Sequence, residues 1–517
     1  MMSDAPGQNR FDNQQVRYAL NIGNLLADYH MHQIAFYVQD AWKISPRFQI
    51  NYGLRWEGQI NPEAVSSNTD VVKAIQGTIF PDEGKFDPST LHNNLNQWMP
   101  RLGFTYAPIK GSNKTVIRGH TGLFYAASPM LIYGGTTNNF RIPPGDLSLS
   151  YIPTVGSSSP TVYQVFKTAG VDLNTAKLDS LPILTPDQFT TALAKLTGVS
   201  PNPFLAASFT GTGNDYQNPR AFQGGLGADQ EIANGWVAGI QFNYINTVHL
   251  ERNRDYNLPF PTVRAADGRP IFARGNRPLP QYGQITIRES SARSMYRGMS
   301  LNTRYSASKR LQFGVQYTVA QSYSDDDNER SASGFTYDNP FTMKPEYGYS
   351  NLDIRNQFAT YAIGNLPWGI ELSGSFRASS GQPIDPLAGS DVNADGSSSN
   401  DRPYQAVGVP FGRNSFRNLG FKFVDFRFLK DFRFGERMKL QFSTEMFNMF
   451  NFANVVIGPA GINTANTIYG LGIDATGAPV APRSTFMLLK NADGSYNKSN
   501  NQIGTPFQAQ FGLRFFF

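Results

Sequence analysis

The chain has 517 residues, no cysteine and a formal net charge of +6. The lack of cysteine excludes disulfides and thiolate metal sites. The small charge, without a block of Lys or Arg, gives no reason to expect a nucleic-acid partner. Aromatic residues make up 13% of the chain, including 39 Phe, whereas charged residues make up only 16%. Soluble domains usually have about 25% charged residues, so this composition is unusual for a soluble surface.

Residues 1–30 contain no positively charged start followed by a continuous apolar run, so we predict no signal peptide there. No stretch of about 18 consecutive apolar residues occurs anywhere, and no transmembrane helix is expected. A membrane-spanning strand needs only about 9–11 residues, of which every second one is apolar. The negative mean hydropathy of −0.36 is therefore compatible with a membrane β-barrel.

Apolar and polar residues alternate along much of the chain. Within residues 47–57, one face of the predicted strand carries Phe48, Ile50, Tyr52, Leu54 and Trp56. The residues between them are mostly polar, which is the period of a strand with one apolar and one polar face. The apolar face suits lipid, and the polar face suits a water-filled lumen.

The same alternation predicts thirteen strands, at residues 34–44, 46–58, 97–108, 114–126, 218–232, 236–250, 294–308, 310–323, 353–366, 369–381, 420–433, 437–449 and 506–517. Short turns join many of them in pairs, and long segments rich in Gly, Asn, Ser, Pro and Asp separate the pairs. This pattern is typical of an outer-membrane barrel, whereas a soluble sandwich has more even spacing. We predict an all-β protein: a transmembrane antiparallel β-barrel with long extracellular loops.

Strand parity limits how this barrel closes. The last strand is expected to end in the periplasm, and counting back through the turns gives the strand at 34–44 the same direction. An antiparallel sheet cannot close on thirteen strands, because two parallel strands would then be neighbours. Either residues 14–25 supply a fourteenth strand, or earlier strands lie outside this sequence. The lack of a signal peptide favours the second alternative.

Several segments together resemble a known family. Residues 35–57 read AFYVQDAWKISPRFQINYGLRWE and are similar to a hairpin of TonB-dependent outer-membrane receptors, closest to their Oar-like branch. Further matches follow in the expected order, at Pro100–Tyr106, Thr115–Gly119, Leu352–Phe358, Asn400–Pro403, Glu445–Asn451 and Phe511–Phe515. The resemblance covers residues 31–517 as the C-terminal part of the barrel, and leaves 1–30 as an N-terminal segment with a candidate partial strand.

The resemblance implies a 22-stranded barrel in the bacterial outer membrane, of which this chain carries 13–14 strands. It also implies an N-terminal plug and a TonB box, both of which this sequence lacks. The implied function is uptake of a bulky ligand, such as a glycan, peptide or siderophore. The implied partners are outer-membrane lipid and lipopolysaccharide, the barrel-assembly machinery, and the TonB system through a plug absent from this chain. The ligand itself is not identified.

Two other functions remain open at this point. The chain could be an outer-membrane channel or adhesin without a plug, or a soluble all-β binding protein such as a propeller or lectin-like array. An enzyme is not expected, because the sequence has no G-x-S-x-G, P-loop, G-x-G-x-x-G or H-E-x-x-H motif. No organic cofactor is expected either.

The C-terminal strand is the sharpest local signal. Its apolar positions include Phe507, Phe511, Leu513, Phe515 and Phe517. We interpret them as a signal for the barrel-assembly machinery. The alternative is an ordinary edge strand, but a long apolar edge would be an aggregation hazard in a soluble protein.

Tryptophans near the ends of predicted strands suggest the aromatic belts found at membrane interfaces. The candidates are Trp42, Trp56, Trp236 and Trp368.

One segment matches the start of a calcium loop, D-x-[DN]-x-[DN]-G. Its candidate ligands are Asp391, Asn393, Asp395 and Asp401, with Gly396 permitting the turn. The usual Glu at position twelve is replaced by Arg402, and a polar turn that caps its own backbone is the alternative. The acidic run Asp325–Asp327 is expected to be a solvated charge run in an outer loop, rather than a cation site.

Overall fold

The fold was analysed in a computed structural model. It describes residues 16–23, 28–62, 70–81, 84–88, 91–112, 114–133, 146–151, 153, 158–175, 180–198, 209–213, 215–273, 276–306, 308, 310–327, 337–397, 399–435, 437–458 and 465–517. None of the helices within these ranges is long and apolar enough to cross a membrane.

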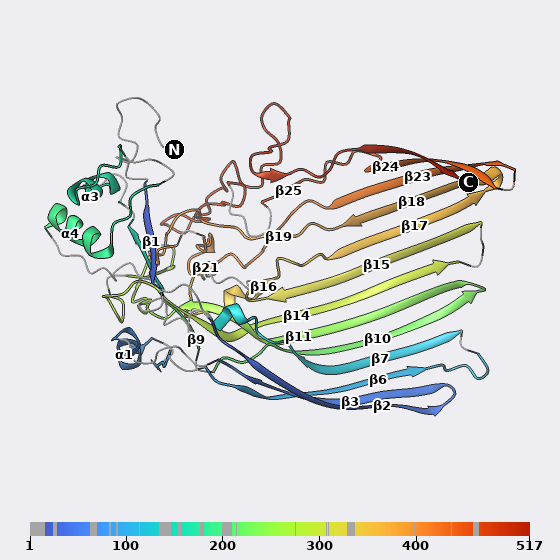
Figure 1. The fold of residues 1–517 in the computed structure, drawn as a ribbon, viewed down its shortest axis with the longest axis horizontal. Helices are drawn as coiled ribbons and strands as arrows, with labels where there is room; N and C mark the ends of the chain where they lie inside the picture. The colour runs from blue at the N-terminus through green and yellow to red at the C-terminus, as the bar shows by residue number, and fades with distance from the viewer. Residues whose placement is uncertain are drawn as a thin grey trace.

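A single large antiparallel sheet dominates the described chain (Figure 1). Each strand on its main path pairs with the next strand of the path along the sequence, as the thirteen predicted strands require. In order, the strands are β2 (His32–Ser45), β3 (Phe48–Ile60), β6 (Asn94–Tyr106), β7 (Thr115–Tyr125), β10 (Arg220–Ala233), β11 (Trp236–Asp255), β14 (Ile285–Tyr305), β15 (Leu311–Ser324), β17 (Asn356–Leu366), β18 (Ile370–Ser379), β23 (Phe421–Phe434), β24 (Met438–Phe447) and β27 (Gln508–Phe516). Two short strands, β16 (Gly348–Tyr349) and β9 (Phe209–Thr212), add to its side.

The register keeps the two faces of the sheet distinct. Tyr52 is opposite Leu102 on the next strand, and Phe442 is opposite Leu513, so apolar side chains meet across strands. On the other face Arg118 and Ser300 alternate with apolar neighbours along their strands. A slip of one residue would exchange the faces, so the alternation itself specifies the pairing. Side chains on the apolar face are not covered by other parts of the described chain; Val38 on β2, for example, is 70% exposed.

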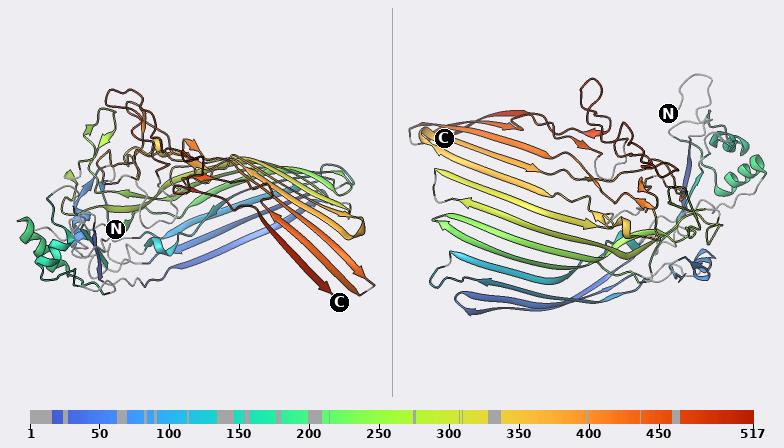
Figure 2. Two further views of the ribbon diagram at one scale, coloured as in Figure 1. Left: turned by 90° about the horizontal axis from the view of Figure 1, so that it is seen from above. Right: turned by 180° about the vertical axis from the view of Figure 1, so that it is seen from behind.

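Short turns and long loops lie at opposite ends of the sheet (Figures 1 and 2). The C-terminus lies at the short-turn end, as the strand count predicted (Figure 1). Two of the short turns place glycines in the left-handed region, Gly235 at φ +68° and Gly435 at φ +66°. A side chain at these two positions would be strained.

The possible fourteenth strand is not part of the large sheet. Of residues 14–25, the structure describes 16–23, and there β1 (Tyr18–Gly23) pairs with β8 (Asp146–Tyr151) from a long loop. The first of the two alternatives for closing the barrel is therefore wrong. β2 and β27 stand at the two ends of the sheet order, and no pairing in the described residues joins them.

The loops contain helices that the sequence interpretation missed: α1 (Asp70–Gly77), α3 (Val162–Thr168) and α4 (Pro186–Thr197). Thr161 and Thr185 cap α3 and α4, each in a capping box with a Gln three residues later. This T-x-x-Q spacing was visible in the sequence and is a known helix start. α3 and α4 pack with one another around Phe166 and Phe189.

Several smaller elements complete the loops. They are the strands β4 (Ile79–Phe80), β5 (Gly84–Lys85), β12 (Val263–Arg264), β13 (Pro270–Ile271), β19 (Pro383–Ile384), β20 (Tyr404–Ala406), β21 (Val409–Pro410), β22 (Phe416–Arg417), β25 (Val456–Ile457) and β26 (Asn501–Gln502), with 3-10 turns at Met130–Tyr133, Lys344–Glu346 and Pro367–Gly369.

The buried apolar clusters lie among the loops rather than within the wall. The largest packs α1 against the loop-side part of β14 and against β9, through residues such as Ile75, Phe209 and Ile285, each fully buried. β11 and β14 reach farther than predicted, to Asp255 and from Ile285, because the extra residues pair with each other beyond the wall. These extensions place Arg252 and Glu289 among the loops.

Candidate functional site

The polar face of the wall is lined by charges that pair across strands. Arg118 on β7 meets Asp229 on β10 at 2.6 Å, and Arg427 on β23 meets Glu445 on β24 at 3.1 Å. These side chains are partly exposed, and such pairs contribute only about 0–1 kcal/mol each. Their effect is to keep the face wet and nearly neutral rather than to hold the fold together.

Two of the hollows on this side of the described chain concern the loops and the first strands. The larger, of about 880 Å³, lies over β2, β3, β6 and β7 and is lined by residues that include Gln39, Asn51, Arg101 and His120. The second, of about 490 Å³, lies where β7, β10, β11, β14 and β15 meet the loops. Its polar lining includes Gln223, Glu251, Ser294, Ser324, Asp326, Asp327 and Ser350. Three charged residues, Glu251, Asp326 and Asp327, line the second hollow.

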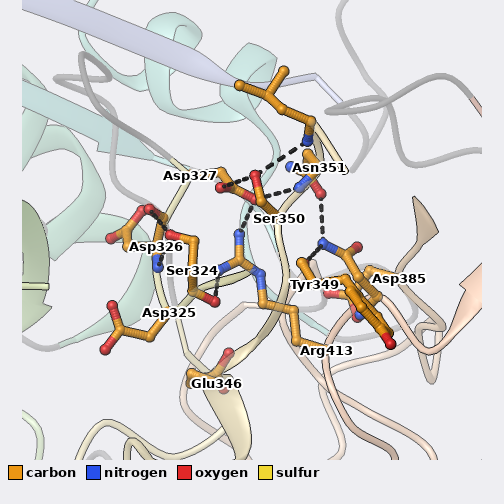
Figure 3. Close-up of polar contacts among 12 residues, drawn as sticks. Ser324, Asp325, Asp326, Asp327, Glu346, Tyr349, Ser350, Asn351, Asp385 and Arg413 are labelled. Carbon is orange, nitrogen blue, oxygen red and sulfur yellow. Dashed lines mark hydrogen bonds and ion pairs between the residues drawn. The ribbon is translucent and has the colours of Figure 1, made fainter. Parts of the chain in front are cut away.

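The acidic run at the end of β15 is part of this boundary (Figure 3). Asp325 and Asp326 are only 6% and 5% exposed, so the expected solvated charge run is wrong. Asp325 pairs with Arg252 of the extended β11 at 2.8 Å, and Asp326 accepts a hydrogen bond from the Tyr337 hydroxyl. The extension of β11 past the wall brings Arg252 alongside, which no local pattern in the sequence indicated.

Asp327 anchors a distant loop to the same place (Figure 3). Its carboxylate pairs with Arg413 at 2.7 Å and accepts a hydrogen bond from the Ser350 hydroxyl at 2.8 Å. Arg413 is 3% exposed and also donates to the Ser324 carbonyl oxygen at 3.3 Å. Charge-assisted hydrogen bonds of this kind are stronger than neutral ones. They fasten the loop between β18 and β23 onto the end of β15.

A second buried cation lies deeper in the loops. Arg402 is 2% exposed and pairs with Glu346 at 2.7 Å and with Asp385 at 3.1 Å. Its backbone N–H also donates to Asp338 at 3.2 Å. Burial raises the pKa of Asp338 to about 6, although Arg402 partly offsets the effect. These ion-paired groups and the loops that carry them are called the loop platform. Its members are Arg252, Asp325, Asp326, Asp327, Tyr337, Asp338, Glu346, Asp385, Arg402 and Arg413.

The candidate calcium loop lies against the loop platform. Asp391 Oδ2 accepts from the Gly396 N–H at 3.0 Å, Asn393 Oδ1 accepts from the Asp395 N–H at 2.9 Å, and Gly396 has the predicted sharp turn at φ +97°. Asp401 is fully buried, and burial with the nearby carboxylates of Asp395 and Asp338 raises its pKa to about 8. The structure thus brings the four predicted ligands into one loop, and metal binding itself stays a prediction.

The four tryptophans fall near the two ends of the wall. Trp42, Trp236 and Trp368 lie near the short turns, and Trp368 is 82% exposed in the turn between β17 and β18. Trp56 lies nearer the loops and packs by Trp98 with 6.4 Å between ring centroids. This placement agrees with two belts, but an interfacial role stays a prediction.

The terminal strand β27 pairs only with β24 among the described strands. Phe511, Leu513 and Phe515 share the apolar face, and the first two are each 70% exposed. Phe507 precedes the strand and Phe517 follows it. Their proposed role in barrel assembly is untested by this geometry.

A family model described as "Outer membrane beta barrel domain" matches residues 14–412, well over half of the chain. The chain belongs to this family. The wall therefore lies in the bacterial outer membrane, with its apolar face toward lipid and its polar face toward the lumen. The alternative of a soluble all-β protein is wrong. No curated protein matches the sequence.

The chain is similar to several solved receptor structures, at low sequence identity. The siderophore receptor PiuA from Acinetobacter baumannii has 10% identity and a TM-score of 0.39, covering 82% of this chain and 39% of its own. A mutant of the ferric enterobactin receptor PfeA from Pseudomonas aeruginosa has 11% identity and a TM-score of 0.43, covering 94% and 45%. The ferric preacinetobactin receptor BauA from A. baumannii has 11% identity and a TM-score of 0.40, and the match covers 94% of this chain and 43% of BauA. The chain thus spans less than half the length of each.

Proposed function

We propose that this chain forms the wall and outer loops of a TonB-dependent receptor of the Oar-like branch, which takes up a bulky ligand across the outer membrane. The motifs at 35–57 and 400–403 support the assignment to that branch. In this proposal the plug and TonB box belong to a part of the protein outside this sequence, and the ligand is a glycan, peptide or siderophore.

The observation that carries the proposal is the width of the wall. Barrels of about eight strands fill their interior with side chains, those of 16–18 strands hold a channel, and 22-stranded barrels hold a plug. The main sheet path already has thirteen strands with a polar lumen face. Because β2 and β27 run the same way, closure into an even-stranded barrel needs an odd number of further strands. A closed barrel therefore has at least fourteen strands, which is more than the roughly eight whose side chains fill the interior, and in this proposal it reaches the 22 strands that hold a plug.

The second supporting feature is the loop platform. Uptake receptors need a ligand surface that is fixed before the ligand arrives, because ordering loops upon binding costs affinity. Arg413 holds the loop between β18 and β23 to the end of β15 through its buried ion pair with Asp327, and Arg402 joins the same loop to Glu346. The hollow of about 490 Å³ is lined by Asp327 and Ser324, the partners of Arg413, and is the proposed place of first capture.

The test uses the complete gene product, extracted from outer membranes and placed in planar lipid bilayers in potassium chloride. We expect heat-modifiable migration on gels and no steady ion conductance, because a plug fills the lumen. Removal of the segment that precedes the wall should open a large steady conductance. A complete product that conducts from the start would contradict the receptor and favour the plugless channel.

Dependence on TonB is tested in living cells. The probe is a panel of fluorescently labelled maltodextrins, peptides and ferric siderophores, offered to cells that express the complete gene with or without a functional TonB. Accumulation of one class should require both the gene and TonB. Binding at the surface without any accumulation would favour an adhesin.

A further inference from the structure

We propose that the loop at residues 391–401 binds one calcium ion through side-chain oxygens of Asp391, Asn393, Asp395 and Asp401. Positions one, three and five of the loop carry oxygen ligands, and Gly396 occupies position six. Calcium takes 6–8 oxygen ligands from carboxylates, amide and backbone carbonyls and water. Asp401, at position eleven, takes the part of the carboxylate that usually closes such a loop at position twelve.

An unsatisfied buried oxygen points to the ion. Asp401 is fully buried, and its Oδ1 atom has no hydrogen-bond partner in the part of the chain that the structure describes. Its other oxygen accepts from the Val392 N–H at 3.3 Å, which places the carboxylate against the start of the motif. A buried acceptor without a partner is costly, more so when it is charged. A bound cation would satisfy it.

The hydrogen bonds inside the loop leave room for coordination. Asp391 and Asn393 each use one side-chain oxygen to accept a backbone N–H. Asp395 accepts from the Ser397 N–H at 2.7 Å and from the Asn400 amide at 2.8 Å. A carboxylate offers about four acceptor sites and an amide oxygen two, so each of these groups keeps at least one lone pair for an ion. The bonds hold the loop curled around the oxygens.

The loop has more negative charge than its neighbours neutralise. The carboxylate of Asp401 lies near those of Asp391, Asp395 and Asp338, whereas the guanidinium of Arg402 is engaged with Glu346 and Asp385. No three Asp, Glu, His or Cys side chains in the described ranges already enclose a metal position. The proposal therefore requires Asn393 to contribute and the carboxylates to turn toward the ion, which the flexible coordination of calcium permits.

Calcium at this place would fasten three loops together. The Asn393 amide donates to the Asp338 carbonyl at 3.0 Å, and the Asn393 carbonyl accepts from the Phe272 N–H at 2.7 Å. Tyr337, next to Asp338, donates to Asp326 at the edge of the smaller hollow. The ion would thus stabilise the loop platform from its far side. This inference does not depend on the proposed uptake function.

The test measures binding of calcium alone to the full chain in detergent, after treatment with a chelator. Equilibrium dialysis with radioactive calcium should show one site in the wild type, and calcium should raise the thermal midpoint of the loops. Asp401→Asn and Asp391→Asn should each weaken binding at least about tenfold, the loss of one strong charge-assisted ligand. Magnesium should bind more weakly.

The matched control is Asp474→Asn, which changes an exposed aspartate that also caps its own turn. It should bind calcium as the wild type does, and it also corrects for calcium held by residual lipopolysaccharide. Heat-modifiable migration of every variant shows whether the wall is intact. The proposal is overturned if the wild type binds no more calcium than Asp401→Asn, or if the Asp474→Asn control loses the site equally.

Discussion

The wall and the loop platform are stabilised in opposite ways. In the wall, large apolar side chains such as Val38 and Phe511 are about 70% exposed, and the charged pairs on the lumen face are partly wet. Backbone pairing and surrounding lipid must hold it. In the platform, Arg402 and Arg413 are almost fully buried among carboxylates, and apolar clusters fill the space between loops. The platform is organised like a soluble protein standing on a membrane barrel.

The contrast follows from the surroundings of the two regions. The apolar residues of the wall face lipid, so the wall has no buried core that a water-filled lumen could disrupt. The loop platform lies in water, has no lipid to support it, and needs its own core and ion pairs. Substitutions should therefore have different effects in the two regions.

The largest effect is expected for Arg402→Ala. It leaves Glu346 buried without its cation, and breaking a buried pair costs about 3–5 kcal/mol. Limited proteolysis and hydrogen exchange should show open loops while the wall keeps its heat-modifiable migration. The matched variant Arg118→Ala removes a half-exposed pair in the wall and should cost less than about 1 kcal/mol. Equal costs for the two variants would remove the distinction between regions.

Phe242→Arg should have the next largest effect. Phe242 lies on the lipid face of β11, where an arginine near the bilayer centre costs about 2–4 kcal/mol. Its neighbour Gln241 lies on the lumen face, so Gln241→Arg should be close to neutral. Chemical unfolding in lipid vesicles measures both. A larger cost for Gln241→Arg would mean that the two faces are assigned the wrong way round.

A pH dependence should be confined to the platform. The pKa of Asp338 is raised to about 6, so the folded state keeps a proton that the unfolded state loses from about pH 4. In calcium-free buffer, the stability of the platform should fall as pH rises through this window, and Asp401 should extend the fall to about pH 8. Asp338→Asn should make the stability of the platform less dependent on pH between about pH 4 and pH 6. The measurement is thermal unfolding at a series of pH values, observed by near-ultraviolet circular dichroism. An unchanged slope would contradict this.

The smallest effect is expected for Ala394→Gly. Ala394 has φ +61°, a left-handed conformation that costs about 1 kcal/mol or more for a residue with a Cβ atom. Glycine should stabilise the platform by a few tenths of a kcal/mol to about 1 kcal/mol after its entropy cost. Ala238→Gly, near the start of β11 and paired on both sides, should instead destabilise the wall by about 0.5–1 kcal/mol. The thermal midpoints of the two variants should therefore shift in opposite directions.

The sequence by itself determined the wall. A period of two is a local property, so the thirteen strands, their two faces and the position of short turns could be predicted from neighbouring residues. The calcium motif and the capping boxes of α3 and α4 are equally local, although the helices were missed. The number of strands is also readable from the sequence, and an odd number cannot close into an antiparallel barrel.

Only the tertiary structure decided the loop platform and the place of residues 18–23. Arg413 and Asp327 are 86 residues apart in sequence, and β1 finds its partner in a loop more than a hundred residues later. Asp325–Asp327 looked like a solvated run because the arginines that bury it come from elsewhere. Which of many loop cations meets which carboxylate depends on where the strands end, and no short window of sequence contains that information.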